Sequence, residues 1–135
     1  MRDLAAGLMG AMVVLAAPAA AQDEGAGAAL YQRHCAMCHG VEATGRGPLA
    51  PDLPVQSTDL TGLAAAGGGE FPYLRAARRI DGRDPLVAHG SPMPVWGEYF
   101  EGAQAAIRLP GGQPLMASRP VIDLLAFLVS VQRPD

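Results

Sequence analysis

Both cysteines of the chain lie in one short stretch, Cys35-Ala36-Met37-Cys38-His39. Two thiols separated by two residues and followed directly by an imidazole are typical of three structures. These are a dithiol redox pair, part of a zinc site, and an attachment point for covalent haem. Each imposes a different fold on the residues around it, so the choice among them constrains the chain more than any other feature of the sequence.

The residues from Ala26 to His39 predict a helix that contains the motif. On a helix, Cys35, Cys38 and His39 are related as i, i+3 and i+4 and share one face. Two thiols on one face can bond to two substituents at one porphyrin edge, while the imidazole reaches the iron. This geometry is why Cys-x-x-Cys-His is the signature of c-type haem attachment.

The two alternatives fit the sequence less well. The motif would supply three of the four ligands that zinc requires. The fourth ligand would have to be His34 or His89, but His34 is ordinarily a helix-surface residue and His89 a loop residue. The chain also has no second Cys-x-x-Cys. A thioredoxin-like dithiol is expected at the end of a strand, but the residues before Cys35 predict a helix. The sequence therefore favours haem.

The N-terminal segment predicts an export signal. An uncharged apolar run, Leu4 to Ala17, is followed by a proline and by the small residues Ala19 to Ala21. The alternative is a retained membrane anchor, because the apolar stretch is almost long enough to span a bilayer. We expect residues 1–21 to be a cleaved signal peptide and residues 22–135 to form one periplasmic domain with no stable membrane insertion.

Composition excludes some partners and points to a cofactor. Aromatic residues are only 5% of the chain, which also has 17 glycines and 12 prolines. A small domain with so little bulky apolar material usually relies on a disulfide, a metal or a cofactor. The net charge is −3, every basic residue is arginine, and no basic run occurs. This balance argues against nucleic acid and against a lipid-surface patch.

The second axial position of a haem held by one histidine is either open or filled by another residue. Met93 is flanked by prolines, which fix φ and hold its loop extended. A rigid, irregular loop suits a thioether that must be held against iron, although methionine ordinarily fills space in a core. The pattern alone leaves both readings open. Met37 lies inside the motif and cannot reach the opposite face of a haem, and Met116 is the alternative ligand.

These features resemble the class I c-type cytochromes, and the resemblance runs over essentially the whole chain after residue 21. Gly27, Tyr31 and Cys35 reproduce the family's Gly-x3-aromatic-x3-Cys approach to the motif. "APDL" resembles its Pro-x-Leu stretch, "MPVWG" its methionine loop and "DLLAFLVSVQ" its terminal helix. The resemblance implies an all-α fold, with three to four helices and long Gly/Pro loops around one covalently bound haem c.

The resemblance also implies roles for individual residues. Those that it assigns to the cofactor are Cys35 and Cys38 for the thioether bonds, His39 and Met93 for the iron, and Pro51, Leu53 and Trp96 for the haem pocket. Because a metal-bound histidine normally donates its other ring N–H to a carbonyl, we expect His39 to donate to Pro51, with Pro48 as the rival acceptor. A haem propionate is expected to pair with one of Arg46, Arg75, Arg78 and Arg79. The ordinary alternative is that these arginines are exposed to solvent on the protein surface.

Two further helices are predicted. Glu70 to Ile80 is the first, with Pro72 in its first turn and Gly82 after its end. The second follows Ser118 as N-cap and carries apolar residues at helical spacing, namely Val121, Leu124, Leu125 and Leu128. Between them, Arg108 to Met116 reads as a loop. Gly27 is either a close helix crossing or part of a frayed helix start, and the resemblance puts Phe127 near the first helix.

A histidine and a methionine on one iron leave no vacant position for a substrate, which indicates one-electron transfer and not catalysis. We therefore expect a periplasmic monohaem carrier between redox protein partners, as a monomer or as a subunit. The alternatives are a haem enzyme or gas sensor with an open sixth position, and a fixed haem subunit of a larger complex. The absence of lysine predicts a docking face that is apolar or acidic.

Overall fold

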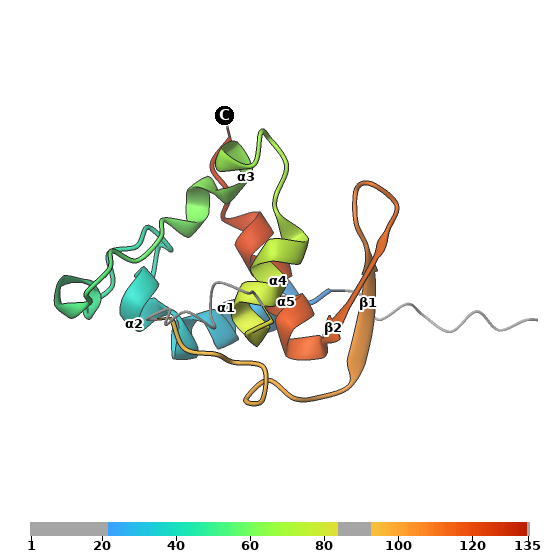
Figure 1. Ribbon diagram of the computed structural model, residues 1–135, viewed down its shortest axis with the longest axis horizontal. Helices are drawn as coiled ribbons and strands as arrows, with labels where there is room; N and C mark the ends of the chain where they lie inside the picture. Colours follow the sequence, from blue (N-terminus) through green and yellow to red (C-terminus); the bar gives the residue numbers. More distant parts are fainter. Residues whose placement is uncertain (1–21, 84–92, 135) are drawn as a thin grey trace, which may run out of the picture.

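The computed structural model describes residues 22–83 and 93–134, and these form a mostly helical fold (Figure 1). Its helices are α1 (Glu24–His34), α2 (Ala36–His39), α3 (Leu63–Ala66), α4 (Tyr73–Asp81) and α5 (Arg119–Ser130), with short 3₁₀ helices η1 (Ala50–Asp52) and η2 (Leu60–Gly62). A hairpin of β1 (Gln104–Arg108) and β2 (Pro114–Ser118) precedes α5. None of the helices within these ranges combines the length and the apolar character needed to cross a bilayer. The predicted signal peptide, residues 1–21, lies outside the described residues.

The first and last helices cross at Gly27. A Cβ atom at this position would overlap the backbone carbonyl of Asp123 on α5, so only glycine fits. The buried Asp123 carboxylate accepts a hydrogen bond from the backbone N–H of Asp23 (2.9 Å), and the Asp23 side chain in turn caps α1 by accepting from Ala26 N–H (2.9 Å). Of the two interpretations of Gly27 that the sequence left open, the structure shows the close helix crossing.

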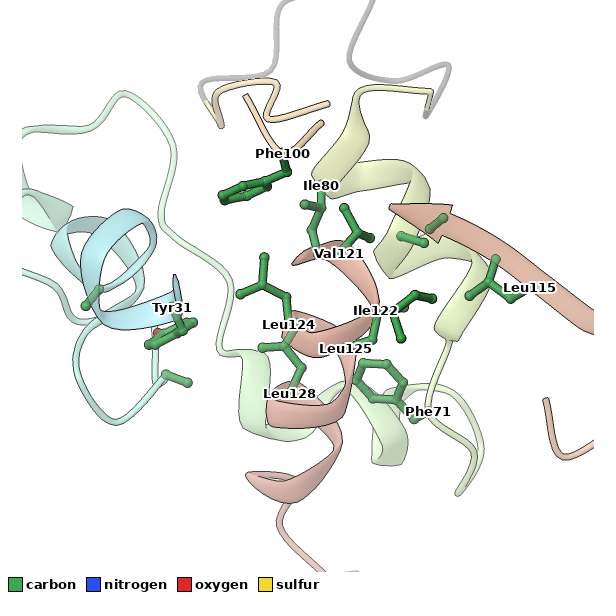
Figure 2. Close-up of a cluster of buried hydrophobic side chains, with 14 residues drawn as sticks. Tyr31, Phe71, Ile80, Phe100, Leu115, Val121, Ile122, Leu124, Leu125 and Leu128 are labelled. Atoms are coloured by element: carbon green, nitrogen blue, oxygen red, sulfur yellow. The ribbon is translucent and has the colours of Figure 1, made fainter. Parts of the chain in front are cut away.

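The core lies around α5. Figure 2 shows the α5 side chains at its centre. Around them lie Tyr31 of α1, Ile80 of α4, Phe71 just before α4, and Leu115 of β2. The four predicted apolar positions of α5 are all buried, and Ser118 is its N-cap residue, as expected. Tyr31 and Phe127 pack with ring centroids 4.8 Å apart, which agrees with the aromatic contact that the resemblance implied.

The predicted helix from Ala26 to His39 is interrupted at Cys35. The φ of this residue, −115°, is far from the helical value of about −63°, so α1 ends at His34 and α2 starts at Ala36. The hydrogen bond from His39 N–H to the Cys35 carbonyl (2.9 Å) still spans i to i+4. The helical spacing of the motif is therefore kept across the break.

The second predicted helix is shorter than expected at its start. Pro72 is the N-cap of α4 and not a residue of its first turn, because its ψ of 65° is not helical, and Glu70 and Phe71 precede the helix. The predicted stop is confirmed, since Gly82 adopts the left-handed conformation (φ 84°) that commonly ends helices.

The prediction that Arg108 to Met116 form a loop is only partly right: residues 109–113 are the turn of a hairpin, but Arg108 and residues 114–116 belong to its strands. β1 and β2 are antiparallel, and their register pairs Gln104 with Ser118 at one end and Arg108 with Pro114 at the other. Burial alternates along β2, where Leu115 and Ala117 are buried, and this period of two is that of a strand with one face on the core. Pro114 is tolerated because it is the first residue of its strand, and Gly112 supplies the positive φ (82°) of the turn.

We expect Gly27→Ala to destabilise the protein by about 3 kcal/mol, because the added methyl would force apart the backbones of α1 and α5. Without a clash, replacing a helical glycine by alanine stabilises the helix by about 1 kcal/mol. A decrease in the free energy of unfolding therefore identifies the clash. The free energy of unfolding from urea titration measures it. Gly111→Ala is the matched control, since a Cβ there meets no atom within 4 Å. Equal stabilities for the two variants would contradict the crossing.

Candidate functional site

A cavity of about 470 Å³ lies between the end of α1, α2, α4 and α5, and its size is that of a small-molecule or cofactor site. The residues at its wall that carry chemistry are Cys35, Cys38, His39, Met93, Arg75 and Arg79. Most of the remaining wall is apolar and includes Leu53. The structure thus brings together both thiols, the imidazole and one thioether around one apolar space.

Local hydrogen bonds hold the motif at the cavity. The buried Tyr31 hydroxyl donates to the Gly40 carbonyl (2.6 Å), which fixes the turn directly after His39. Gly47 N–H donates to the Cys38 carbonyl (3.1 Å), and a Cβ at Gly47 would overlap the backbone of Met37. The loop after the motif therefore lies tightly against α2.

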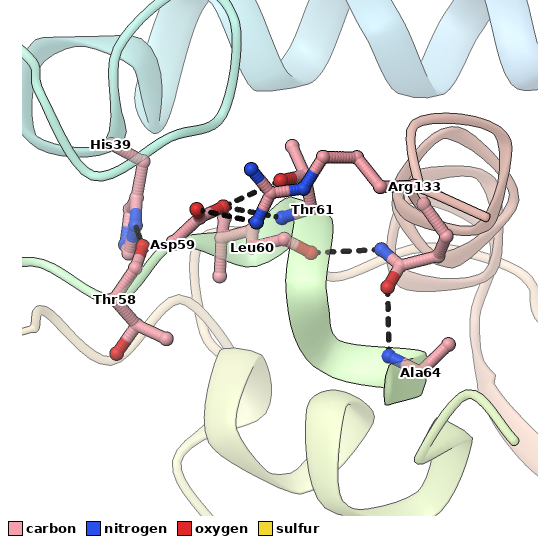
Figure 3. Close-up of polar contacts among 8 residues, drawn as sticks. His39, Thr58, Asp59, Leu60, Thr61, Ala64 and Arg133 are labelled. Carbon is pink, nitrogen blue, oxygen red and sulfur yellow. Dashed lines mark hydrogen bonds and ion pairs between the residues drawn. The ribbon is translucent and has the colours of Figure 1, made fainter. Parts of the chain in front are cut away.

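His39 is buried, and its ring has a defined orientation (Figure 3). Its Nδ1 lies 3.0 Å from the Thr58 carbonyl oxygen. A carbonyl only accepts, so Nδ1 carries the hydrogen and Nε2 keeps the lone pair. Burial lowers the pKa of His39, and the hydrogen bond to Thr58 opposes this shift. The result is a neutral imidazole with Nε2 as its donor atom, which is the form that binds metals.

The prediction that His39 donates to the carbonyl of Pro51, or alternatively of Pro48, is wrong. Leu49 N–H donates to the Met37 carbonyl (2.9 Å), and this bond fastens the loop around both prolines to the backbone of α2. Both prolines are exposed, and neither is among the residues at the cavity wall. The ring instead meets Thr58, which the sequence analysis missed and for which the sequence holds no evident signal.

The Cys35 thiol lacks the lowered pKa of a reactive dithiol. Burial, and secondarily the neighbouring Cys38, raise the pKa of the Cys35 thiol to about 11. Reactive dithiols have lowered pKa values, because the thiolate is the nucleophile. Within the described residues, no three histidine, cysteine or acidic side chains gather as a metal-binding group. His89, one of the proposed zinc ligands, lies outside them.

The three methionines after residue 21 occupy different environments. Met93 is half-buried, packs against the core and lines the cavity. Met116, the alternative ligand, is 58% exposed on β2, and Met37 is 50% exposed on α2. Neither of these two is among the residues at the cavity wall. Residues 84–92, which precede Met93, lie outside the described residues.

Trp96, expected in the pocket, belongs to an aromatic cluster that is not part of the cavity wall. Its ring centroid lies 5.2 Å from that of His34, 5.6 Å from Tyr99 and 5.5 Å from Phe100. Its backbone N–H donates to the Ile80 carbonyl (2.9 Å) at the end of α4. Trp96 therefore fastens the segment that follows Met93 to the core.

The arginines predicted to meet a propionate divide into two pairs. Arg75 and Arg79 on α4 line the cavity, whereas Arg46 and Arg78 are exposed and are not among the residues at its wall. The cavity thus carries cationic side chains on one helix as well as an apolar interior. Paired thiols, a neutral imidazole, a thioether and nearby arginines are together a donor set that fits a covalently attached haem.

The comparison with protein families gives one match. Residues 25–132 match the family model described as Cytochrome c. This range starts within α1, contains all the cavity residues named above and ends after α5. No curated protein and no solved structure gives a significant match.

We expect Tyr31→Phe to lower the free energy of unfolding by about 1 kcal/mol, because it removes a buried hydrogen bond and leaves the Gly40 carbonyl without that donor. Burial raises the pKa of the Tyr31 phenol, so this loss should be the same from pH 6 to pH 9. Tyr99→Phe is the control, since Tyr99 is 66% exposed. A Tyr31→Phe protein as stable as the parent would contradict the assigned bond.

Proposed function

The chain belongs to the cytochrome c family, and from this premise we propose that it is a periplasmic monohaem electron carrier whose iron is ligated by His39 and Met93. Members of this family hold haem c covalently and transfer electrons. The observation that carries the proposed ligand pair is that His39 and Met93 line the same cavity as both cysteines, whereas Met37 and Met116 are exposed.

The residues of the chain have distinct tasks in this proposal. When bound, the haem supplies a one-electron couple at its iron. Cys35 and Cys38 hold it through thioether bonds. His39 presents Nε2, because Thr58 occupies its other nitrogen, and Met93 supplies the soft sulfur ligand. Arg75 and Arg79 are the candidates for holding the propionates, since both line the cavity.

The ligand pair and the apolar wall favour electron transfer over catalysis. A thioether stabilises reduced iron and raises its reduction potential relative to a second nitrogen ligand. An apolar surrounding favours the state of lower charge and keeps water away from the iron. With His39 and Met93 both bound to it, the iron would have no position left for a substrate. The chain would exchange electrons only with redox proteins that dock on it.

Cellular location and partners are proposed from the sequence. The signal-like segment 1–21 would direct the chain to the periplasm, where the haem would be attached. The absence of lysine and the net charge of −3 suggest partners that recognise an apolar or acidic face. Salt dependence of the electron-transfer rate tests this, since a rate that falls with salt indicates a basic partner surface.

The ligand assignment predicts an optical change in Met93→Ala. The parent protein should be low-spin, with the sulfur–iron charge-transfer band in its oxidised form, and the variant should lose that band and bind carbon monoxide. Met37→Ala and Met116→Ala, at exposed positions, are matched controls that should keep the parent spectrum. A high-spin parent that binds carbon monoxide readily would instead indicate an enzyme or gas sensor with an open sixth position.

The attachment assignment predicts changes in intact mass. Cys35→Ala or Cys38→Ala should lose one thioether bond and yield much less holoprotein, and His39→Ala should leave the haem absent or misligated. Expression in the cytosol without the maturation machinery should give colourless apoprotein. The mass after export also shows whether residues 1–21 are removed. Normal yields of either cysteine variant with two covalent links would contradict the assignment.

Gel filtration of the protein from its native source distinguishes a diffusing carrier from a subunit. Elution at the mass of a single holoprotein supports the diffusing carrier. The full chain has a mass of 13.9 kDa before cleavage of the signal and attachment of the haem. Co-elution with a redox enzyme would indicate that the chain is a fixed haem subunit.

A further inference from the structure

Gln132, just after α5, reaches back to the segment that follows Thr58. Its side-chain Oε1 accepts a hydrogen bond from Ala64 N–H (2.8 Å). Its Nε2 donates to the carbonyls of Leu60 (2.8 Å) and Leu128 (2.7 Å). One amide therefore joins the end of the last helix to both ends of the stretch 60–64.

Arg133 adds two contacts to the same stretch. Its backbone N–H donates to the Thr61 carbonyl (2.9 Å), and its Nη2 donates to the Asp59 carboxylate (3.0 Å). The Asp59 carboxylate also accepts from the N–H (3.0 Å) and the hydroxyl (2.6 Å) of Thr61. We call Gln132 and Arg133 the C-terminal clasp. Together they hold Asp59, Leu60, Thr61 and Ala64.

The clasped stretch begins at the residue after Thr58, whose carbonyl is the acceptor for His39 Nδ1. The bonds on its other side come from the loop after the motif: Leu60 N–H donates to the Ala43 carbonyl (2.8 Å), and Gln56 Nε2 donates to the Gly45 carbonyl (2.9 Å). The Thr58 carbonyl is thus held between the motif loop and the C-terminal clasp. Loss of either anchor would let this carbonyl move away from the ring.

We propose that Gln132 and Arg133 are positioning residues that hold the Thr58 carbonyl against His39 and thereby set the reduction potential of the iron. This inference rests on the proposed function. A hydrogen bond from the far ring nitrogen raises the basicity of a metal-bound histidine. A more basic ligand stabilises the oxidised iron more than the reduced iron. The clasp therefore keeps the potential lower than it would be with a weaker hydrogen bond.

The test uses the full-length holoprotein and its variants Gln132→Leu and Arg133→Gln. Each should raise the reduction potential, measured by redox titration followed optically. Hydrogen exchange at the amides of Thr61 and Ala64 should become about five- to tenfold faster, as expected for the loss of one hydrogen bond. Arg133→Lys, which can still pair with Asp59, should restore the parent potential.

Matched controls come from the hairpin far from this contact. Gln113→Leu changes an exposed glutamine at the turn, and Arg108→Gln removes an exposed bond to the Gly112 carbonyl (3.2 Å). Both should leave the potential and the exchange rates at the parent values. They separate the effect of the clasp from the general effect of removing a glutamine or an arginine.

Two outcomes would overturn the inference. Faster exchange with an unchanged potential would make the clasp merely structural, and unchanged exchange would show that it does not hold the segment. If Gln132→Leu fails to fold, the comparison of Arg133→Gln with Arg133→Lys still decides. The proposed function fails separately: a parent protein without covalent haem, or with a spectrum indifferent to Met93→Ala, contradicts the ligand pair and not the clasp.

Discussion

The crossing of α1 and α5 at Gly27 is the contact on which the site depends. It puts the start of α1 directly against the backbone of α5, and the motif follows at the other end of α1. Since α5 also carries more of the buried apolar side chains than any other described element, this crossing fixes the distance between the motif and the core. The cavity is the space that remains between them. A larger residue at Gly27 would change the shape of that space as well as the stability of the protein.

The cavity explains how a chain so poor in aromatic residues forms a stable domain. Leu60, Leu63 and Ala76 line the cavity and are only partly buried, so the apolar surface of its wall is not fully covered by protein. A flat apolar ligand in this space would complete the burial. Cofactor binding and folding are then thermodynamically linked, because any ligand that binds only the folded state stabilises it.

The sequence predicts those parts of the fold and site whose cause is local. The Cys-x-x-Cys-His spacing, the apolar period of α5 and the glycine after α4 each act within one or two helical turns, and each was predicted correctly. The hairpin was missed because its glycines and prolines resemble those of a loop, while the alternating burial of β2 depends on where α5 lies. Thr58 was missed because its contact with His39 is also not local: it spans 19 residues and involves only a backbone carbonyl.

The Thr58 contact also shows that the imidazole is oriented by three separate parts of the chain. The motif supplies the ring, the segment after η1 supplies the acceptor, and the residues after α5 hold that acceptor in place. An acceptor immediately downstream of the motif would have tied the ring to its own loop alone. With the acceptor joined to the C-terminus, the orientation of the imidazole ring follows the packing of α5, which also forms one wall of the cavity. Under the proposed ligation, the same helix would therefore govern both the space around the iron and the electronic character of its histidine ligand.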